Sequence, residues 1–291
     1  MQLSPQALEK LIALIHQWTG LALGPDKAYL IRHRIAPVVR SCGFTGYEEL
    51  LLRLQGGTAT RIQDAVIEAI TTKETSFFRD PWLFDAMQQH VLPELVNRRK
   101  DTKGALRGIR ICSAGASTGQ EAHTLAIVVR EFIDSAPHGF AEKDFSIIAV
   151  DISGEAIDAA KTGLYSPQEV ARGLSESRLQ RFFQRQGDGW QANESLRKLI
   201  QFRQFNLMRP LTELGAFDLI LCRNVLIYFD EPTRAQVCRG MSRALREGGW
   251  LALGSAESAQ DAGGELESVK FGRAFFYRKT AAKSPTGNRS A

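Results

Sequence analysis

The chain has 291 residues, of which 44% are hydrophobic and 24% are charged, values typical of a globular protein with one large domain or two ordinary ones. The net charge of +5 suits an acidic partner but is far below that of a dedicated nucleic-acid binder, so no nucleic acid is expected. No apolar run approaches the roughly 18 residues of a membrane span, and the N-terminus lacks the layout of a signal peptide. The four cysteines form no CxxC pair, so we expect no zinc site, no disulfide framework and a cytoplasmic protein.

Residues 1–72 are predicted to form an N-terminal helical domain. Apolar residues recur there at helical spacing, as at Leu8, Leu11, Ile12 and Ile15. The segment 27–40 contains no acid and four basic residues, namely Lys27, Arg32, Arg34 and Arg40. This segment is either a solvated helix face or a docking surface for an acidic protein.

Residues 73–107 are predicted to be a linker and the first helix of a second domain. The linker begins within TTKETSFFRDPW, residues 71–82, in which Thr75 and Arg79 would lie one turn apart if the segment were helical. The guanidinium of Arg79 could bind a ligand carboxylate or form a surface ion pair. Phe77 and Phe78 are expected to pack rather than to bind.

From residue 108 to 280 strand-like and helix-like segments alternate, which predicts a doubly wound α/β sheet. The expected strands are Ile109–Ser113, Phe145–Val150, Ile200–Phe205, Phe217–Cys222, Trp250–Leu253 and Phe275–Lys279. A Gly187-Asp188-Gly189 turn interrupts the alternation and predicts a small antiparallel β insertion at about 179–203. The small, polar residues 281–291 are expected to be disordered.

A loop from Ser113 to Gly119 joins the first predicted strand to a helix beginning at Gln120. A glycine loop between strand and helix brings backbone close to an adenosyl cofactor, although this loop is not GxGxxG and contains no lysine for a nucleoside triphosphate. Asp151 ends the second strand, where a carboxylate usually accepts the ribose hydroxyls. Loop and acid support a dinucleotide or S-adenosylmethionine about equally, and a tight turn with a capping aspartate is the purely structural alternative.

Polar residues at other element ends refine this choice. Glu121 at the helix start could simply favour the helix dipole, or it could hold the ammonium or sulfonium of S-adenosylmethionine, groups with no counterpart in NAD. Asn206 follows the third strand and Arg223-Asn224 follow the fourth. Because the carboxyl ends of parallel strands face the ligand crevice, we expect these residues at one site, unless they are polar exits into solvent.

Several segments resemble, in order, motifs of the CheR family of chemoreceptor methyltransferases. They are TTKETSFFRDP, SAGASTGQE, FNLM, FDLILCRNVLIYFD and GSAES, and the match runs from about residue 5 to 280. The resemblance implies a Rossmann-like domain that uses S-adenosylmethionine, preceded by a helical domain and carrying an inserted β-subdomain. It implies methyl transfer to glutamate carboxylates on the cytoplasmic helical bundle of methyl-accepting chemoreceptors, giving the methyl esters of sensory adaptation.

The resemblance also assigns residues. The family's cofactor contacts carry over to Thr75, Arg79, Glu121, Asp151, Asn206, Leu207, Arg223 and Asn224. The basic segment 27–40 resembles the family's receptor-docking surface. Lys73 departs from the family, which has a cofactor-contacting Asn there, and His123 lies in EAHT where the family has EPYS. His123 is expected to pack.

No residue is assigned as a chemical catalyst, because a glutamate carboxylate is already ionised at neutral pH. Methyl transfer then needs alignment and exclusion of water, for which Tyr228 and the Phe77–Phe78 segment are expected to shield the crevice. The predicted insertion looks short compared with that of family members that tether to a receptor C-terminal peptide, so we expect that no such tether is needed. The protein is also expected to be a monomer. The alternatives are a methyltransferase for another carboxylate acceptor and a non-catalytic adaptor that binds S-adenosylmethionine.

Overall fold

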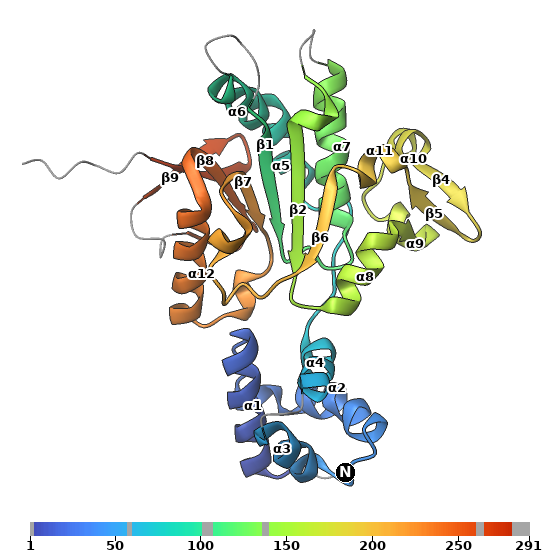
Figure 1. The fold of residues 1–291 in the computed structure, drawn as a ribbon, viewed down its shortest axis with the longest axis vertical. Helices are drawn as coiled ribbons and strands as arrows, with labels where there is room; N and C mark the ends of the chain where they lie inside the picture. The colour runs from blue at the N-terminus through green and yellow to red at the C-terminus, as the bar shows by residue number, and fades with distance from the viewer. Residues whose placement is uncertain (1–2, 57–59, 101–106, 136–139, 260–264, 281–291) are drawn as a thin grey trace, which may run out of the picture.

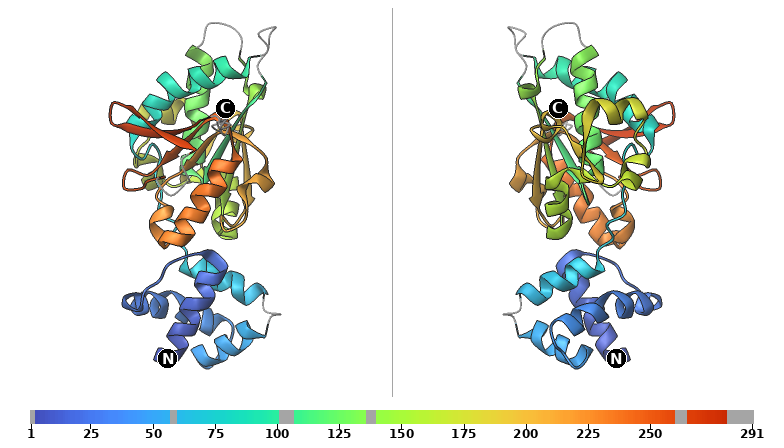
Figure 2. Two further views of the ribbon diagram at one scale, coloured as in Figure 1. Left: turned by 90° about the vertical axis from the view of Figure 1, so that its left-hand side faces the viewer. Right: turned by 90° about the vertical axis from the view of Figure 1, so that its right-hand side faces the viewer.

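The computed structural model describes most of the chain, namely residues 3–56, 60–100, 107–135, 140–259 and 265–280. The tail predicted to be disordered, 281–291, lies outside these residues. Figure 1 shows a helical domain beneath one edge of a large sheet, and the side views of Figure 2 show that the two parts meet over a narrow region. None of the helices in the described segments is both long and apolar enough to cross a membrane.

The N-terminal domain consists of helices whose apolar faces meet in one core, so the predicted helical domain is confirmed. Their bounds are α1 Pro5–Thr19, η1 Pro25–Lys27, α2 Ala28–Ser41, α3 Tyr47–Gln55 and α4 Thr60–Ile70. Helix α1 begins where the Ser4 hydroxyl accepts a hydrogen bond from the amide of Ala7 at 3.3 Å. It ends at Gly20, whose φ of 73° suits a residue without a side chain. Leu11 and Ile15, one turn apart on α1, are fully buried in the shared core.

The larger domain is built on a seven-stranded sheet in the order β6-β2-β1-β7-β8-β10-β9. The strands from β6 to β8 run parallel, and β10 and β9 are antiparallel to their neighbours. Their bounds are β1 Ile109–Ala114, β2 Phe145–Asp151, β6 Ile200–Gln204, β7 Phe217–Cys222, β8 Leu245–Leu253, β9 Leu266–Phe271 and β10 Ala274–Lys279. The predicted Rossmann-like fold is therefore confirmed, although β9 was not predicted and β8 begins at Leu245 rather than at Trp250.

Helices cover both faces of the sheet because successive side chains of a strand point to opposite faces. In β7, Leu219 and Leu221 join the core that includes α5, α6 and α7, whereas Ile220 and Cys222 join the core that includes α12. Figure 1 shows α7 and α12 on either side of the strands. The bounds are α5 Pro81–Ala86, η2 Met87–Val91, α6 Leu92–Arg99, α7 Gln120–Ser135, η3 Glu142–Asp144, α8 Gly154–Thr162, η4 Leu211–Leu214, η5 Leu226–Tyr228 and α12 Glu231–Ala244.

The strand order reverses between β1 and β7. From β1 the sheet grows through β2 to β6, and from β7 it grows through β8 in the opposite direction. In a parallel α/β sheet the ligand crevice lies beyond the carboxyl ends of the two strands at such a switch point. Glu121 lies in the first turn of α7, just after the loop that follows β1, and Arg223 directly follows β7, so the topology places two of the predicted site residues at this crevice.

A separate three-stranded antiparallel sheet forms the inserted subdomain. Gln186 pairs with Gly189 across a Gly187-Asp188 turn, as the sequence predicted. The bounds are β3 Leu164–Tyr165, α9 Pro167–Ala171, α10 Glu176–Phe182, β4 Phe183–Gln186, β5 Gly189–Ala192 and α11 Glu194–Arg197. The small sheet therefore starts before the predicted bound of 179, because β3 pairs with β5, and residues 200–203 belong instead to β6 of the large sheet.

Backbone contacts join the two domains at the carboxyl edge of the large sheet. Leu21 forms an isolated antiparallel bridge with Phe229, and the amide of Ala22 donates to the carbonyl of Tyr228 at 2.8 Å. The imidazole of His16 lies 2.9 Å from the Asp230 carboxylate. The helical domain thus lies over the loop that follows β7, which is the loop at the predicted crevice.

Candidate functional site

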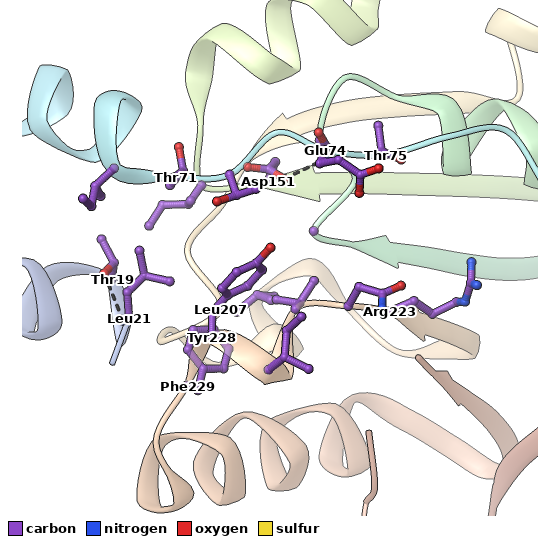
Figure 3. A pocket seen from close by; sticks show the side chains of 18 of the residues that line it. Thr19, Leu21, Thr71, Glu74, Thr75, Asp151, Leu207, Arg223, Tyr228 and Phe229 are labelled. Atoms are coloured by element: carbon purple, nitrogen blue, oxygen red, sulfur yellow. Dashed lines mark hydrogen bonds between the residues drawn. The ribbon is translucent and has the colours of Figure 1, made fainter. Parts of the chain in front are cut away.

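A cavity of about 430 Å³ lies at the carboxyl edge of the sheet, between the two domains. Figure 3 shows side chains from the linker, the strand ends and the helical domain around it. All the predicted cofactor contacts line it, namely Thr75, Arg79, Glu121, Asp151, Asn206, Leu207, Arg223 and Asn224. The fold therefore brings together residues that lie up to 149 positions apart in the chain (224 minus 75).

The loop after β1 forms one wall of the cavity and requires its glycine. The amides of Gly115 and Ala116 both donate to the carbonyl of Val150 at 2.8 Å, which holds the loop against the end of β2. Gly115 has a φ of 79°, and a Cβ atom there would lie 2.3 Å from Val225 Cγ2. A side chain at this position is excluded, so the backbone itself borders the cavity.

Asp151, the last residue of β2, is held by backbone amides rather than by a cation. Its Oδ2 accepts a hydrogen bond from the Ser117 amide at 2.8 Å, and its Oδ1 accepts one from the Ser153 amide at 2.9 Å. Burial raises the pKa of this carboxyl above its ordinary value, an effect that the two amides partly oppose. Each carboxylate oxygen keeps a further lone pair with which it can accept a hydrogen bond from a ligand in the cavity.

Arg223, the residue after β7, ties three segments together. Its side chain is only 2% exposed, and its guanidinium lies 3.0 Å from the Glu121 carboxylate and 2.6 Å from that of Asp80. The same group donates to the carbonyl oxygen of Arg79 at 2.7 Å. Glu121 is therefore engaged with Arg223 and, through its other oxygen, with the Ser113 hydroxyl at 2.8 Å. Its carboxylate faces the cavity as part of an ion cluster rather than alone.

Asn224 is fixed in an unusual backbone conformation beside Arg223. Its φ of 58° is uncommon for a residue other than glycine. The carboxylate of Glu257 stabilises this corner, because its Oε2 accepts from the amides of Asn224 at 2.8 Å and Gly254 at 2.7 Å. Glu257 was not assigned from the sequence, although it lies in the GSAES segment that carries part of the resemblance.

Two polar atoms at this corner are buried and have no hydrogen-bond partner in the described structure, the Nε of Arg223 and the Oδ1 of Asn224. An unsatisfied buried polar atom is costly, and a ligand can relieve the cost. A donor and an acceptor side by side match the carboxylate and ammonium at the amino-acid end of S-adenosylmethionine. Asp151, on the neighbouring strand end, matches the ribose hydroxyls. The residues present therefore fit this cofactor.

The linker segment reaches the cavity in a form that the sequence did not predict. Residues 72–76 are not helical, and positive φ values at Phe78 and Asp80 turn the chain sharply. Arg79 Nη1 lies 3.2 Å from the Glu74 carboxylate, and both residues line the cavity. Phe77 and Phe78 are buried and do not line it, so the predicted packing is confirmed and the predicted shielding by these rings is wrong.

Both departures from the family pattern lie outside the cavity. The ammonium of Lys73 pairs with the carboxylates of Glu155 at 2.8 Å and Glu68 at 3.1 Å. His123 is fully buried, with Nδ1 2.8 Å from the Tyr165 hydroxyl, and burial lowers its pKa to about 4. The imidazole is therefore neutral at pH 7 and packs against the small subdomain, as the sequence predicted.

Asn206 and the N-terminal domain complete the enclosure. The side-chain amide of Asn206 donates to the carbonyl of Trp18 at 2.6 Å, so this residue binds the helical domain as well as lining the cavity. The helical domain contributes further lining residues that were not predicted to line a cavity, namely Thr19, Leu21, Ala22, Leu23, Lys27 and Leu30. Of these only Lys27 had been singled out, as part of the basic segment.

The four basic residues of segment 27–40 have different environments. Arg32 and Arg40 are exposed, and Lys27 lies at the cavity wall. Arg34 instead donates to the carbonyl oxygens of Ile70 at 2.7 Å and Thr71 at 3.1 Å. The guanidinium of Arg34 therefore holds α2 to the end of α4, which corrects its predicted inclusion in a free docking surface.

Comparison with known proteins agrees with this geometry. The CheR methyltransferase all-alpha domain matches residues 6–71, and the CheR methyltransferase SAM binding domain matches residues 73–275. Chemotaxis protein methyltransferase 1 of Pseudomonas aeruginosa is 35% identical over 89% of this chain and 92% of its own length. The chemotaxis protein methyltransferases of Vibrio anguillarum and Escherichia coli are 34% and 30% identical over 95% and 89% of this chain and 98% and 86% of their own lengths. This chain therefore belongs to the CheR methyltransferase family.

Proposed function

We propose that the protein transfers the methyl group of S-adenosylmethionine to glutamate side-chain carboxylates of methyl-accepting chemotaxis receptors, forming glutamate methyl esters in the cytoplasm. One observation supports this most strongly. Arg223 and Asn224, which each have an unpartnered buried polar atom, line one cavity together with Asp151, whose carboxylate is held by amides. The two groups match opposite ends of S-adenosylmethionine, and the same cavity opens beside a basic helix.

The chain's own residues position and enclose the reactants. When bound, S-adenosylmethionine supplies an electrophilic methyl group on a sulfonium. Asp151 orients the ribose, and the Arg223–Asn224 corner orients the amino-acid end. Arg79 lines the cavity beside Glu74, where its guanidinium can contact the cofactor. Tyr228 lines the cavity and is 38% exposed, so its ring can exclude water from the acceptor carboxylate once a partner covers it.

No general base is needed for this reaction. The carboxyl of a glutamate has a pKa near 4.3 and is ionised at neutral pH, so alignment and removal of water are the tasks left to the protein. The placement of His123 is consistent with this scheme, because its imidazole lies in the core against Tyr165 and does not line the cavity.

Charge supports docking of the receptor at α2. Arg32 and Arg40 are exposed after Arg34 is assigned to the domain core, and Lys27, which pairs with Asp26 at 3.3 Å, lies at the cavity wall. A helical bundle rich in glutamate would be attracted to this surface and would bring an acceptor carboxylate to the cavity. We further propose that docking needs no receptor C-terminal peptide. Equal rates on receptors with and without that peptide would support this, and strict dependence on it would contradict it.

The function is tested by incubating the purified protein with tritiated S-adenosylmethionine and cytoplasmic membranes. We expect label in receptor polypeptides that is released as methanol by mild base, the behaviour of a carboxyl methyl ester. Label on small carboxylic acids would favour a methyltransferase for another acceptor. Binding of S-adenosylmethionine without any transfer would favour an adaptor, and either result would contradict the proposal.

A further inference from the structure

A second cavity of about 390 Å³ adjoins the cofactor cavity along the carboxyl edge of the sheet. It lies where β8 ends and β10 begins, and its lining includes Asp80, Trp82, Arg223, Glu257, Arg273 and Phe275. Arg223 lines both cavities, so the two meet at this buried side chain. Figure 2 shows the β9–β10 hairpin, in red, projecting from the large domain on this side.

The acidic groups of the second cavity already have partners. Asp80 pairs with Arg223 at 2.6 Å. The carboxylate of Glu257 accepts hydrogen bonds from backbone amides, including those of Asn224 at 2.8 Å and Ile227 at 3.2 Å. These contacts are internal to the fold, so neither carboxylate offers a free negative charge to a ligand.

Arg273 differs from these acids. Its guanidinium carbon lies 4.2 Å from the centre of the Trp82 ring, and it pairs with no carboxylate among the described residues. A cation stacked on an aromatic face is held in place while its donors stay available. The cavity therefore presents one positioned, uncommitted positive charge.

Apolar side chains are exposed at the second cavity and at the neighbouring cofactor cavity. Phe275, which lines it, is 52% exposed, with the ammonium of Lys270 5.2 Å from its ring centre. Ile227, which lines the cofactor cavity and donates its amide to Glu257, is also 52% exposed. Exposed apolar side chains beside free cations suit an amphipathic protein segment better than a small polar ligand.

We propose that the second cavity docks the helical segment of the acceptor protein that flanks the methylated glutamate. Arg273 pairs with an acidic side chain of that segment, and Trp82 and Phe275 contact its apolar neighbours. Residues three or four positions apart lie about 5–6 Å apart on one helix face. Because Arg223 lines both cavities, one acidic residue can enter the second cavity while the methylated glutamate on the same helix face enters the first. This inference rests on the proposed function.

The test compares Arg273→Glu with Lys100→Glu, using the purified cytoplasmic fragment of a methyl-accepting receptor as the probe. Lys100 makes a similar cation–aromatic contact, 5.3 Å from the centre of the Phe140 ring, but lies before β1, near the opposite edge of the sheet. We expect Arg273→Glu to lower kcat/KM for the fragment about tenfold, mainly through KM, because a new like charge faces the acidic segment. The Kd for S-adenosylmethionine should change less than about twofold in both variants, because neither position lines the cofactor cavity.

A second experiment exchanges the two charges between the protein and the receptor fragment. Lysine in place of an acidic receptor residue three or four positions from the methylated glutamate should restore the rate of Arg273→Glu. Wild-type kcat/KM for Arg273→Glu, or an equal loss in Lys100→Glu, would overturn the inference and leave the proposed function intact. If the wild-type protein does not methylate the fragment, the proposed function and the inference fall together.

Discussion

The two ends of the cofactor cavity use charge in different ways. At one end Asp151 is held by the amides of Ser117 and Ser153, and it forms no ion pair within the part of the chain that the structure describes. At the other end Arg223 is buried between the carboxylates of Glu121 and Asp80. Backbone amides fix a carboxylate while leaving it able to accept bonds from a ligand, whereas a buried ion cluster uses its charges to fix the protein itself. The first arrangement should contribute mainly to affinity, and the second mainly to stability.

Arg223→Met should give the largest effect. The substitution leaves two carboxylates without their cation in a buried site, which typically lowers the free energy of unfolding by about 3 kcal/mol or more. The measurement is urea unfolding without cofactor. Arg79→Met is the matched control, because that side chain is 39% exposed and its ion pair should contribute less than about 1 kcal/mol. Equal unfolding midpoints for the two variants would contradict the comparison.

Asp151→Ala should lower affinity rather than stability. Hydrogen bonds to a charged group contribute about 1.5–3 kcal/mol each, so the Kd for S-adenosylmethionine should rise more than about tenfold. Methyl transfer from the bound state should slow much less, because Asp151 orients the ribose and not the reacting atoms. Calorimetry gives the Kd and single-turnover kinetics give the rate. Unchanged affinity would show that this carboxylate does not contact the cofactor.

The pH dependence of binding tests the same carboxyl more finely. Burial raises the pKa of Asp151 above the ordinary 3.8, so ionised Asp151 costs stability at neutral pH and that cost is relieved as pH falls through the folded pKa. Protonation also removes an acceptor from the cavity. Affinity should therefore begin to fall at a higher pH than an ordinary aspartate would give. Asp151→Ala should lack this component, and identical pH profiles for the two proteins would contradict the assignment.

Much of the large domain, and the polar residues that its strand ends bring to the cavity, could be predicted from local sequence patterns. The apolar run of β7 predicted the strand, and the polar residues Arg223 and Asn224 that follow it were predicted to lie at the crevice, where they line the cavity. The role of the helical domain as a wall could not be predicted, because it depends on pairing between Leu21 and Phe229, which are 208 positions apart (229 minus 21). The strand β9 was not predicted for a different reason. Buried and exposed side chains alternate only weakly along this edge strand, so its sequence lacks the period-two pattern that indicates a strand.

The non-helical linker was also beyond local reasoning. Spacing placed Thr75 and Arg79 one turn apart, but the turn at Phe78 and Asp80 is fixed by distant partners. The amide of Phe78 donates to Thr124 on α7 at 3.1 Å, and Asp80 pairs with Arg223. The predicted residues therefore reached the cavity through tertiary contacts rather than through the periodicity that suggested them.

Lys73→Asn should change stability and cofactor affinity least. It tests whether the Asp151 end of the cofactor cavity depends on the ion pairs beside it. Burial alone would raise the pKa of the neighbouring Glu68, but hydrogen bonds from Ser153, from the Glu155 amide and from Lys73 lower it. The Lys73 side chain is 29% exposed, so losing only this member of the group should lower the free energy of unfolding by no more than about 1 kcal/mol.

The same variant should leave the Kd for S-adenosylmethionine within about twofold of wild type, because the ammonium lies outside the cavity. What position 73 gives the cofactor loop is its main-chain carbonyl, which accepts a hydrogen bond from the Ser117 hydroxyl at 2.9 Å whatever side chain is present. Ser117→Ala removes that bond and should weaken binding more than Lys73→Asn does. If Lys73→Asn instead changed the Kd more, the side chain and not the backbone would support the Asp151 end.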